Sequence, residues 1–168
     1  PRKDEILKKL WEAYHVDSIS GQWDYIEPVL FGYAAGAVIA SYVENFCTAT
    51  DKIAAHFHEW MTAAGGLYLR RHAPYVATLF TTHATVMGRC IAGNHLPLYT
   101  DLTKFNADEL ARQFNVVAKH SIEKAAAAYH DAFVTVSDIT ANECKFLLGR
   151  EPDCITPNGF ENDFVWTG

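Results

Sequence analysis

The sequence YVATLFT at residues 75–81 consists of β-branched, aromatic and other apolar or hydroxyl side chains, which is typical of a β-strand. Three shorter runs of similar character lie at residues 53–57, 132–136 and 154–156. Segments with helical periodicity separate the four runs. Strands that alternate with helices favour a parallel sheet with crossover helices. We therefore predict an α/β fold, a partial Rossmann-like, doubly wound parallel sheet.

Helical periodicity predicts five main helices, at residues 3–14, 26–46, 61–71, 110–129 and 140–149. The second of these segments is apolar nearly all round, which indicates a buried helix rather than a half-exposed one. The glycines and the proline between residues 84 and 105 predict an irregular segment there.

Helix starts are indicated by polar side chains at two places. Asp24 precedes Glu27 by three positions, and Thr140 precedes Glu143 by the same spacing, so both pairs predict a capping box. Ser137 follows the third strand directly and is interpreted as part of a turn that enters the last helix.

Composition and charge exclude several classes of protein. The chain has 168 residues, of which 49% are hydrophobic, so it can form one globular domain over residues 1–168 with a real core. The net charge is −6 at pH 7 and the 14 basic residues are scattered, so nucleic acid and anionic membranes are poor candidate partners. No uninterrupted apolar stretch approaches the roughly 20 residues of a membrane-spanning helix.

Four widely spaced cysteines form no C-x-x-C pair, which favours reduced thiols and a cytoplasmic protein over a disulfide framework. The first predicted helix begins directly after Pro1, and the chain stops at Gly168 in what is interpreted as a loop. We therefore expect the chain to be a single truncated domain.

Polar side chains gather where the predicted strands end. His58 and Glu59 follow the first strand, His83 and then Arg89 follow the second, and Asn158 follows the fourth. Ligands of open parallel sheets bind beyond the carboxyl ends of the strands. The sequence therefore predicts a binding site built from these five residues.

Each of these residues also has a purely structural interpretation. Alternation along the strand places His56 and His58 on the same face, but one His-x-His pair lacks the further ligands of a zinc site, so we expect no metal there. A hydrogen-bonded structural histidine is the commoner role for His56, and Glu59 could simply complement the positive end of a helix. One arginine in a loop, such as Arg89, usually contacts only water.

Common cofactor and nucleophile motifs are absent from the sequence. It contains no G-x-G-x-x-G, no G-x-x-x-x-G-K-[ST] and no G-x-S-x-G. We therefore expect no bound cofactor, no P-loop nucleotide site and no serine-hydrolase nucleophile.

Several motifs together carry a resemblance to a known family. They are VLFGY at 29–33, HEW at 58–60, FTTHAT at 80–85 with GR at 88–89, VSDIT at 136–140 and TPNG at 156–159. In this order and spacing, over roughly residues 16–164, they resemble glycogen synthases of the animal and fungal type, which form family 3 of the retaining glycosyltransferases.

The resemblance implies a two-domain GT-B enzyme with its cleft between two Rossmann-like halves. Such an enzyme transfers glucose from a nucleotide sugar, usually UDP-glucose, to the non-reducing end of an α-1,4-glucan with retention. By the same resemblance, His83 matches the histidine that reaches the donor sugar, Glu59 matches an acidic residue that lines the site in related synthases, and Asn158 lies in a loop near the donor.

The resemblance also implies what the chain lacks. It corresponds to the second half of the N-terminal domain, whereas the paired glutamates and the diphosphate-binding basic residues belong to the family's second domain. We therefore expect the isolated chain to be catalytically inactive, and the choice between UDP-glucose and ADP-glucose stays open.

Two other functions remain possible at this level. A non-catalytic α/β domain that binds glucan or protein would keep the same fold. A metal-dependent hydrolase built on His56 and His58 would need further ligands, for which only His83 and Asp138 are candidates. An unpaired sheet edge and the apolar helix near residue 30 also predict self-association of the isolated chain.

Overall fold

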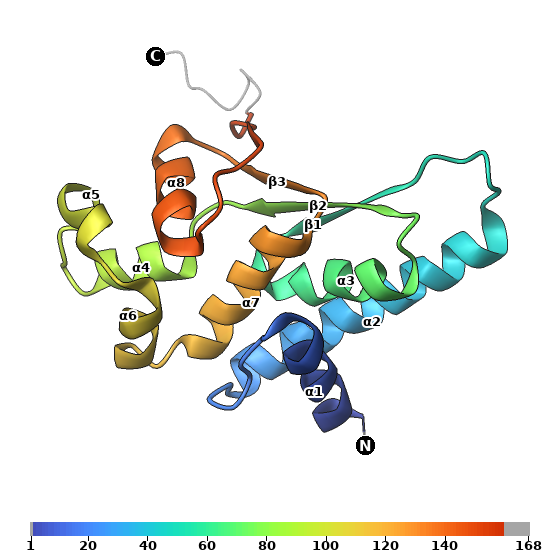
Figure 1. The fold of residues 1–168 in the computed structure, drawn as a ribbon, viewed down its shortest axis with the longest axis horizontal. Helices are drawn as coiled ribbons and strands as arrows, with labels where there is room; N and C mark the ends of the chain where they lie inside the picture. The colour runs from blue at the N-terminus through green and yellow to red at the C-terminus, as the bar shows by residue number, and fades with distance from the viewer. Residues whose placement is uncertain (1, 160–168) are drawn as a thin grey trace, which may run out of the picture.

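The computed structural model describes residues 2–159 (Figure 1). Four strands form one parallel sheet in the order β1-β2-β3-β4: β1 Ala54–His58, β2 Ala77–Thr82, β3 Ala132–Thr135 and β4 Cys154–Ile155. The predicted α/β fold with a parallel sheet is confirmed, and each predicted strand lies within two residues of its observed bounds.

The helices in chain order are α1 Lys3–Tyr14, α2 Trp23–Phe46, α3 Glu59–His72, α4 Val86–Gly93, α5 Leu98–Asp101, α6 Ala107–Gln113, α7 Val117–Tyr129 and α8 Asp138–Glu143. A 3₁₀ turn, Leu102–Lys104, follows α5, and a π-helical turn, Cys144–Leu148, follows α8. Successive strands advance in one direction across the sheet, so right-handed crossovers place α3 and α7 on the same face (Figure 1). The described residues thus form a parallel sheet of partial Rossmann-like character.

The main core lies between this face of the sheet and its helices. Phe57, Phe80 and Phe133 occupy neighbouring positions on β1, β2 and β3, and all three are buried. A second, smaller apolar cluster joins α4, α5 and α6 to the π-helical turn, with Met87 and Ile91 at its centre.

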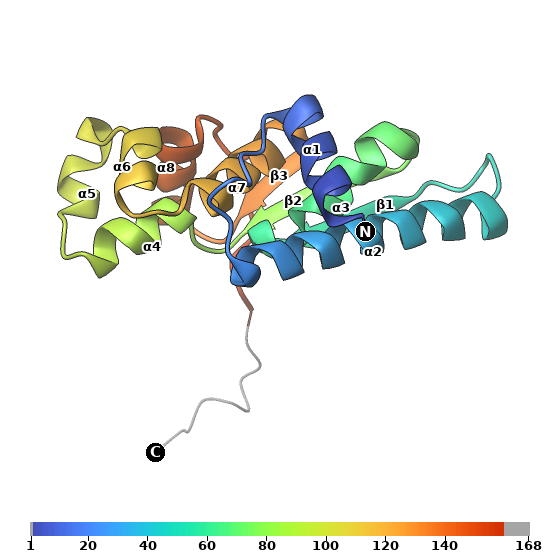
Figure 2. The ribbon, with the colours of Figure 1, turned by 90° about the horizontal axis from the view of Figure 1, so that it is seen from below.

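Helix α2 differs from its prediction, because it is not buried all round. Phe31 is 66% exposed and Phe46 is 74% exposed. The helix runs alongside α3 (Figure 2), and the two backbones meet at glycines: a Cβ on Gly36 would lie 2.5 Å from the carbonyl oxygen of Gly65. Only the face towards α3 is therefore buried.

The same helix corrects the membrane expectation. By length and composition, α2 is long and apolar enough to cross a membrane. The expectation of no such helix was wrong because a few polar residues interrupt the apolar run without making the helix polar on average. Tyr25, Ile26 and Val29 of this helix are buried in the domain core, but most of its apolar length is not buried.

The segment predicted to be irregular contains helices α4 and α5. Thr85 caps α4, because its hydroxyl oxygen accepts a hydrogen bond from the N–H of Gly88 at 2.9 Å. Pro97 directly precedes the first residue of α5, where a proline is compatible with a helix start. The prediction treated Gly88 and Gly93 as helix breakers, but Gly88 lies inside α4 and Gly93 is its last residue.

The predicted long helix at residues 110–129 is wrong, because it is two helices. Asn106 caps α6 through its side-chain oxygen. Asn115 then has a φ of 55°, in the left-handed region, and this ends the first helix before α7 begins. Apolar residues continue at helical spacing across the break, so periodicity alone does not detect it.

Both predicted capping boxes are also wrong. Gln22 occupies the cap position of α2 without a side-chain hydrogen bond, and Asp24 instead binds Lys119. Ser137 caps α8 by accepting the N–H of Thr140 at 3.1 Å, as its interpretation as a helix entry requires. Glu143 points into the protein rather than back to a helix start.

Candidate functional site

His58 and His83 meet at the carboxyl ends of the first two strands. His58 is the last residue of β1, where it pairs with Thr81 of β2, and His83 follows β2 by one residue. The parallel register therefore brings both side chains to the same edge. Nδ1 of His58 lies 3.2 Å from Nε2 of His83, so one ring donates a hydrogen bond to the other.

Glu59 completes this cluster. It is the first residue of α3 and has a φ of 63°, an unusual backbone conformation for a residue other than glycine. One carboxylate oxygen, Oε1, accepts the backbone N–H of His83 at 2.9 Å. The carboxylate thus ties the strand end of β1 to the segment after β2, and three of the five residues singled out from the sequence, His58, Glu59 and His83, lie together.

His56 has the structural role that was weighed for it. Its Nε2 lies 2.7 Å from the hydroxyl of Thr81, and its ring packs 4.0 Å from that of His58, centroid to centroid, on the same face of β1. Burial lowers the pKa of His56, and the positive charges that His58 and His83 can carry lower it further. The imidazole is therefore favoured in its neutral form.

A metal centre is not supported by this geometry. Within residues 2–159, no group of three or more His, Cys, Asp or Glu side chains is arranged to hold a metal ion. His83 is hydrogen-bonded through its ring to His58 and through its backbone N–H to Glu59. Asp138 is an exposed residue of the first turn of α8. Among the described residues, the further ligands that a hydrolase built on His56 and His58 would need are not brought together.

Two of the predicted site residues do not join the cluster. Arg89 is exposed on α4, and Asn158 is exposed beyond β4. In the part of the chain that the structure describes, neither side chain forms a hydrogen bond or ion pair with His58, Glu59 or His83. Arg89 does lie close enough to Glu143 for its charge to lower the pKa of that carboxyl, against a larger rise from burial.

Two buried carboxylates behind the cluster are not among the site residues predicted from the sequence. Glu123 of α7 accepts hydrogen bonds from the Thr82 hydroxyl at 3.1 Å and from the Val86 N–H at 2.9 Å. Glu143 of α8 accepts the Thr85 hydroxyl at 2.8 Å. No local signal identifies them, because a glutamate in a helix is normally solvated.

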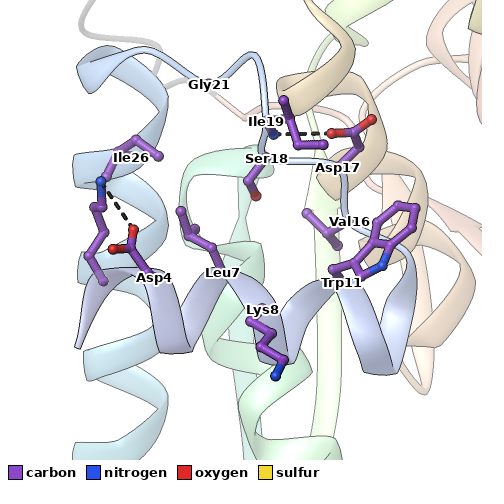
Figure 3. A pocket seen from close by; sticks show the side chains of 11 residues that line it. Asp4, Leu7, Lys8, Trp11, Val16, Asp17, Ser18, Ile19, Gly21 and Ile26 are labelled. Atoms are coloured by element: carbon purple, nitrogen blue, oxygen red, sulfur yellow. Dashed lines mark hydrogen bonds and ion pairs between the residues drawn. The ribbon is translucent and has the colours of Figure 1, made fainter.

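A cavity of about 440 Å³ lies elsewhere, between α1 and the segment that joins it to α2 (Figure 3). Trp11, Ile19 and Asp17 are among the side chains around it, and Asp17 accepts the Ile19 N–H at 3.1 Å. None of the predicted site residues lines this cavity. The chemistry-bearing cluster therefore lies on an open edge of the sheet and not in the cavity.

Comparison with known proteins identifies the family of the chain. Residues 2–164 match the family model described as glycogen synthase. The chain belongs to the glycogen synthase family. It is 36% identical over 153 residues to the glycogen [starch] synthase of Dictyostelium discoideum, 35% identical over 157 residues to that of Neurospora crassa and 34% identical over 152 residues to the human liver form.

These alignments cover 91%, 93% and 89% of this chain but only 17%, 22% and 21% of the respective relatives. The chain therefore spans about a fifth of the length of the curated relatives that it matches. The resemblance of its motifs to glycogen synthases is confirmed, and the matched region begins earlier than expected because it includes α1.

Proposed function

We propose that the full-length protein containing these 168 residues is a glycogen synthase. It transfers glucose from a nucleotide sugar, UDP-glucose or ADP-glucose, to the non-reducing end of an α-1,4-glucan with retention. The observation that carries the proposal is the cluster of His58, Glu59 and His83 at the carboxyl edge of a parallel sheet, in a chain of this family. The expected GT-B architecture and cytoplasmic location belong to the same proposal.

The cluster suits a sugar rather than a phosphate. Sugar hydroxyls are neutral, and imidazole and carboxylate groups can orient them by hydrogen bonds worth about 0.5–1.5 kcal/mol each. Oε1 of Glu59 accepts the His83 N–H. Within residues 2–159, the other carboxylate oxygen, Oε2, makes no hydrogen bond. Oε2 and the free ring nitrogens of the two histidines are the groups assigned to donor or acceptor hydroxyls.

Arg89 and Asn158 are proposed as more peripheral contacts of the nucleotide sugar. Their exposed positions on α4 and beyond β4 lie on segments that leave the same edge of the sheet as the cluster. A ligand larger than one sugar ring would be needed to reach them together with His83.

We also propose that the isolated chain is catalytically inactive. In glycosyl transfer, negative charge develops on the departing nucleotide diphosphate and must be stabilised. Among the described residues, the cluster consists of imidazoles and one carboxylate and contains no lysine or arginine. Detectable turnover by the purified chain would contradict this proposal.

The experiment that tests the activity measures nucleotide release by the full-length protein from UDP-glucose or ADP-glucose, with and without glycogen. Release that requires glycogen supports a synthase. Glycogen binding without release from either donor would favour a non-catalytic glucan-binding domain, and neither binding nor release would contradict both.

Self-association of the isolated chain is a further part of this proposal. Phe31, Val38, Tyr42 and Phe46 are each at least 60% exposed on α2, and this helix contains no lysine or arginine. A second copy offers the same four apolar side chains, so homotypic contact would bury them.

A further inference from the structure

The segment 82–86 runs from the last residue of β2 to the first residue of α4 and carries His83. One side chain from inside the domain holds both of its ends. Glu123 lies on α7, and its Oε1 accepts the Thr82 hydroxyl while its Oε2 accepts the Val86 N–H. The two bonds therefore fasten both ends of the five-residue segment to the same carboxyl group.

Two further carboxylates bind the same segment from other helices. Glu59 at the start of α3 accepts the N–H of His83, and Glu143 of α8 accepts the Thr85 hydroxyl. Glu143 also lies so close to Gly88 that a Cβ there would be 2.1 Å from its Oε2. Of the three carboxylates, only Glu123 contacts both ends of the segment.

Glu123 is completely buried, with none of its surface exposed to solvent. Burial raises the pKa of this carboxyl to about 8, and the negative charges of Glu59 and Glu143 act in the same direction. Glu123 therefore carries a proton at neutral pH. Burying an ionised carboxylate would cost much more desolvation free energy than burying the neutral acid, so protonation stabilises this arrangement.

The proton can occupy only one of the two oxygens. The Val86 N–H can only donate, so Oε2 must remain an acceptor. In the protonated acid the bond to Thr82 runs opposite to that in the carboxylate: Oε1 donates to the Thr82 hydroxyl, and the hydroxyl's own proton can then point to the carbonyl oxygen of Ala84 at 3.4 Å. A connected series of hydrogen bonds thus spans the segment on both sides of His83.

We propose that Glu123 is a positioning residue for the transfer reaction: by holding both ends of the segment 82–86, it keeps the imidazole of His83 against His58 and in place for the donor sugar. The inference rests on the proposed function, since it assigns the purpose of the positioning. Glu123 itself does not contact the substrate, because it is enclosed by protein.

The test compares E123L and E123Q in the full-length protein, each with and without H83A. Leucine cannot bind the Val86 N–H, so E123L is expected to lower kcat about 100-fold, as for a misplaced reacting group, with little change in KM for glycogen. Glutamine can accept from Val86 and donate to Thr82 in the same way as the protonated acid, so E123Q is expected to restore most of the loss.

The double variant separates positioning from general support of the fold. If Glu123 acts through His83, E123L is expected to lower the residual activity of H83A by no more than about twofold, because effects on one interacting unit are not additive. An equal loss with and without H83A would show that Glu123 is only structural and would overturn the proposal.

A milder pair of variants covers the case in which E123L does not fold. T82V removes one bond to Glu123, and T78V removes the matching bond at the other end of β2, where the buried Thr78 hydroxyl donates to Asp131 at 2.9 Å. T82V is expected to lower kcat about tenfold, in proportion to one lost hydrogen bond, and T78V to leave it unchanged. Equal effects of the two variants would count against positioning.

Hydrogen–deuterium exchange of the peptide that covers residues 82–88 gives a readout that does not depend on activity. E123L is expected to speed exchange there at least tenfold, and E123Q to leave it unchanged. If the wild-type protein shows no glycogen-dependent release, the proposed function fails, and the exchange result still decides whether Glu123 holds the segment. Unchanged exchange in E123L would overturn the positioning itself.

Discussion

Nδ1 of His58 lies 3.2 Å from Nε2 of His83, although the two residues are 25 positions apart in the chain. The contact follows from parallel pairing, since β1 and β2 end side by side and each is followed by a polar segment. One of the two rings must donate the proton and the other accept it, so each histidine sets the tautomer of its neighbour.

The first prediction concerns this pair. In the full-length protein, H83A is expected to lower glycogen-dependent nucleotide release by about 100-fold, because it removes a group placed at the donor sugar. H58A removes one hydrogen bond from His83 and one proposed sugar contact, so a loss of at least about tenfold is expected. H72A, at the far end of α3, serves as the control and should match the wild type; a similar loss there would refute the assignment.

The second prediction uses the backbone of Glu59. Both E59A and E59G remove the carboxylate that holds the His83 N–H, so both should reduce transfer. The φ of 63° at this position suits glycine but strains alanine by about 1–2 kcal/mol. Thermal melting should therefore show E59G as the more stable of the two, and a more stable E59A would contradict the left-handed conformation.

The third prediction concerns packing between α3 and the end of α7. A Cβ on Gly66 would lie 1.8 Å from Nε2 of His130, which is buried. G66A is expected to destabilise the protein by about 1–3 kcal/mol through overpacking. Adding H130A removes the clashing ring, so the double variant should melt higher than the sum of the two single losses predicts. Simple additivity would contradict this.

The fourth prediction is a pH dependence of stability. The pKa of Glu123 is raised from 4.5 to about 8, so between these values the folded state holds a proton that the unfolded state releases. Stability from this group is complete below pH 4.5 and is lost as the pH rises through about 8. E123Q does not titrate, so its melting temperature should gain on that of the wild type across this range.

The groups around Glu123 are unchanged in that comparison. They are Glu59 from α3, Glu143 from α8, Cys90 from α4 and Cys144 at the start of the π-helical turn. Their own titration is therefore common to both proteins. A constant difference in melting temperature from about pH 5 to pH 8 would show that Glu123 is ionised throughout.

The fifth prediction concerns the exposed face of α2. Replacing Val38 and Tyr42 by lysine and glutamate, V38K with Y42E, places charges on the apolar surface that is proposed to join two copies. Sedimentation of the isolated chain at tens of micromolar should show association for the wild type and a monomer for the variant. A wild-type monomer would contradict the proposed self-association.

Part of the site could be predicted because its signals are local. His58, Glu59 and His83 directly follow predicted strands, and parallel pairing then requires that they meet. Arg89 and Asn158 were predicted by the same rule, but it gives only the edge of the sheet and not the direction of a side chain. The structure leaves both exposed and apart from the cluster.

The sequence by itself determined the four strands, the parallel sheet and the family, because strand composition and motif spacing are properties of neighbouring residues. Only the tertiary structure decided that α2 keeps an exposed apolar face and that Asn115 divides one periodic segment into two helices. Only the tertiary structure, too, showed Glu123 buried against Thr82, 41 residues away. Burial depends on what packs against a residue from distant segments, and no local pattern in the chain encodes that.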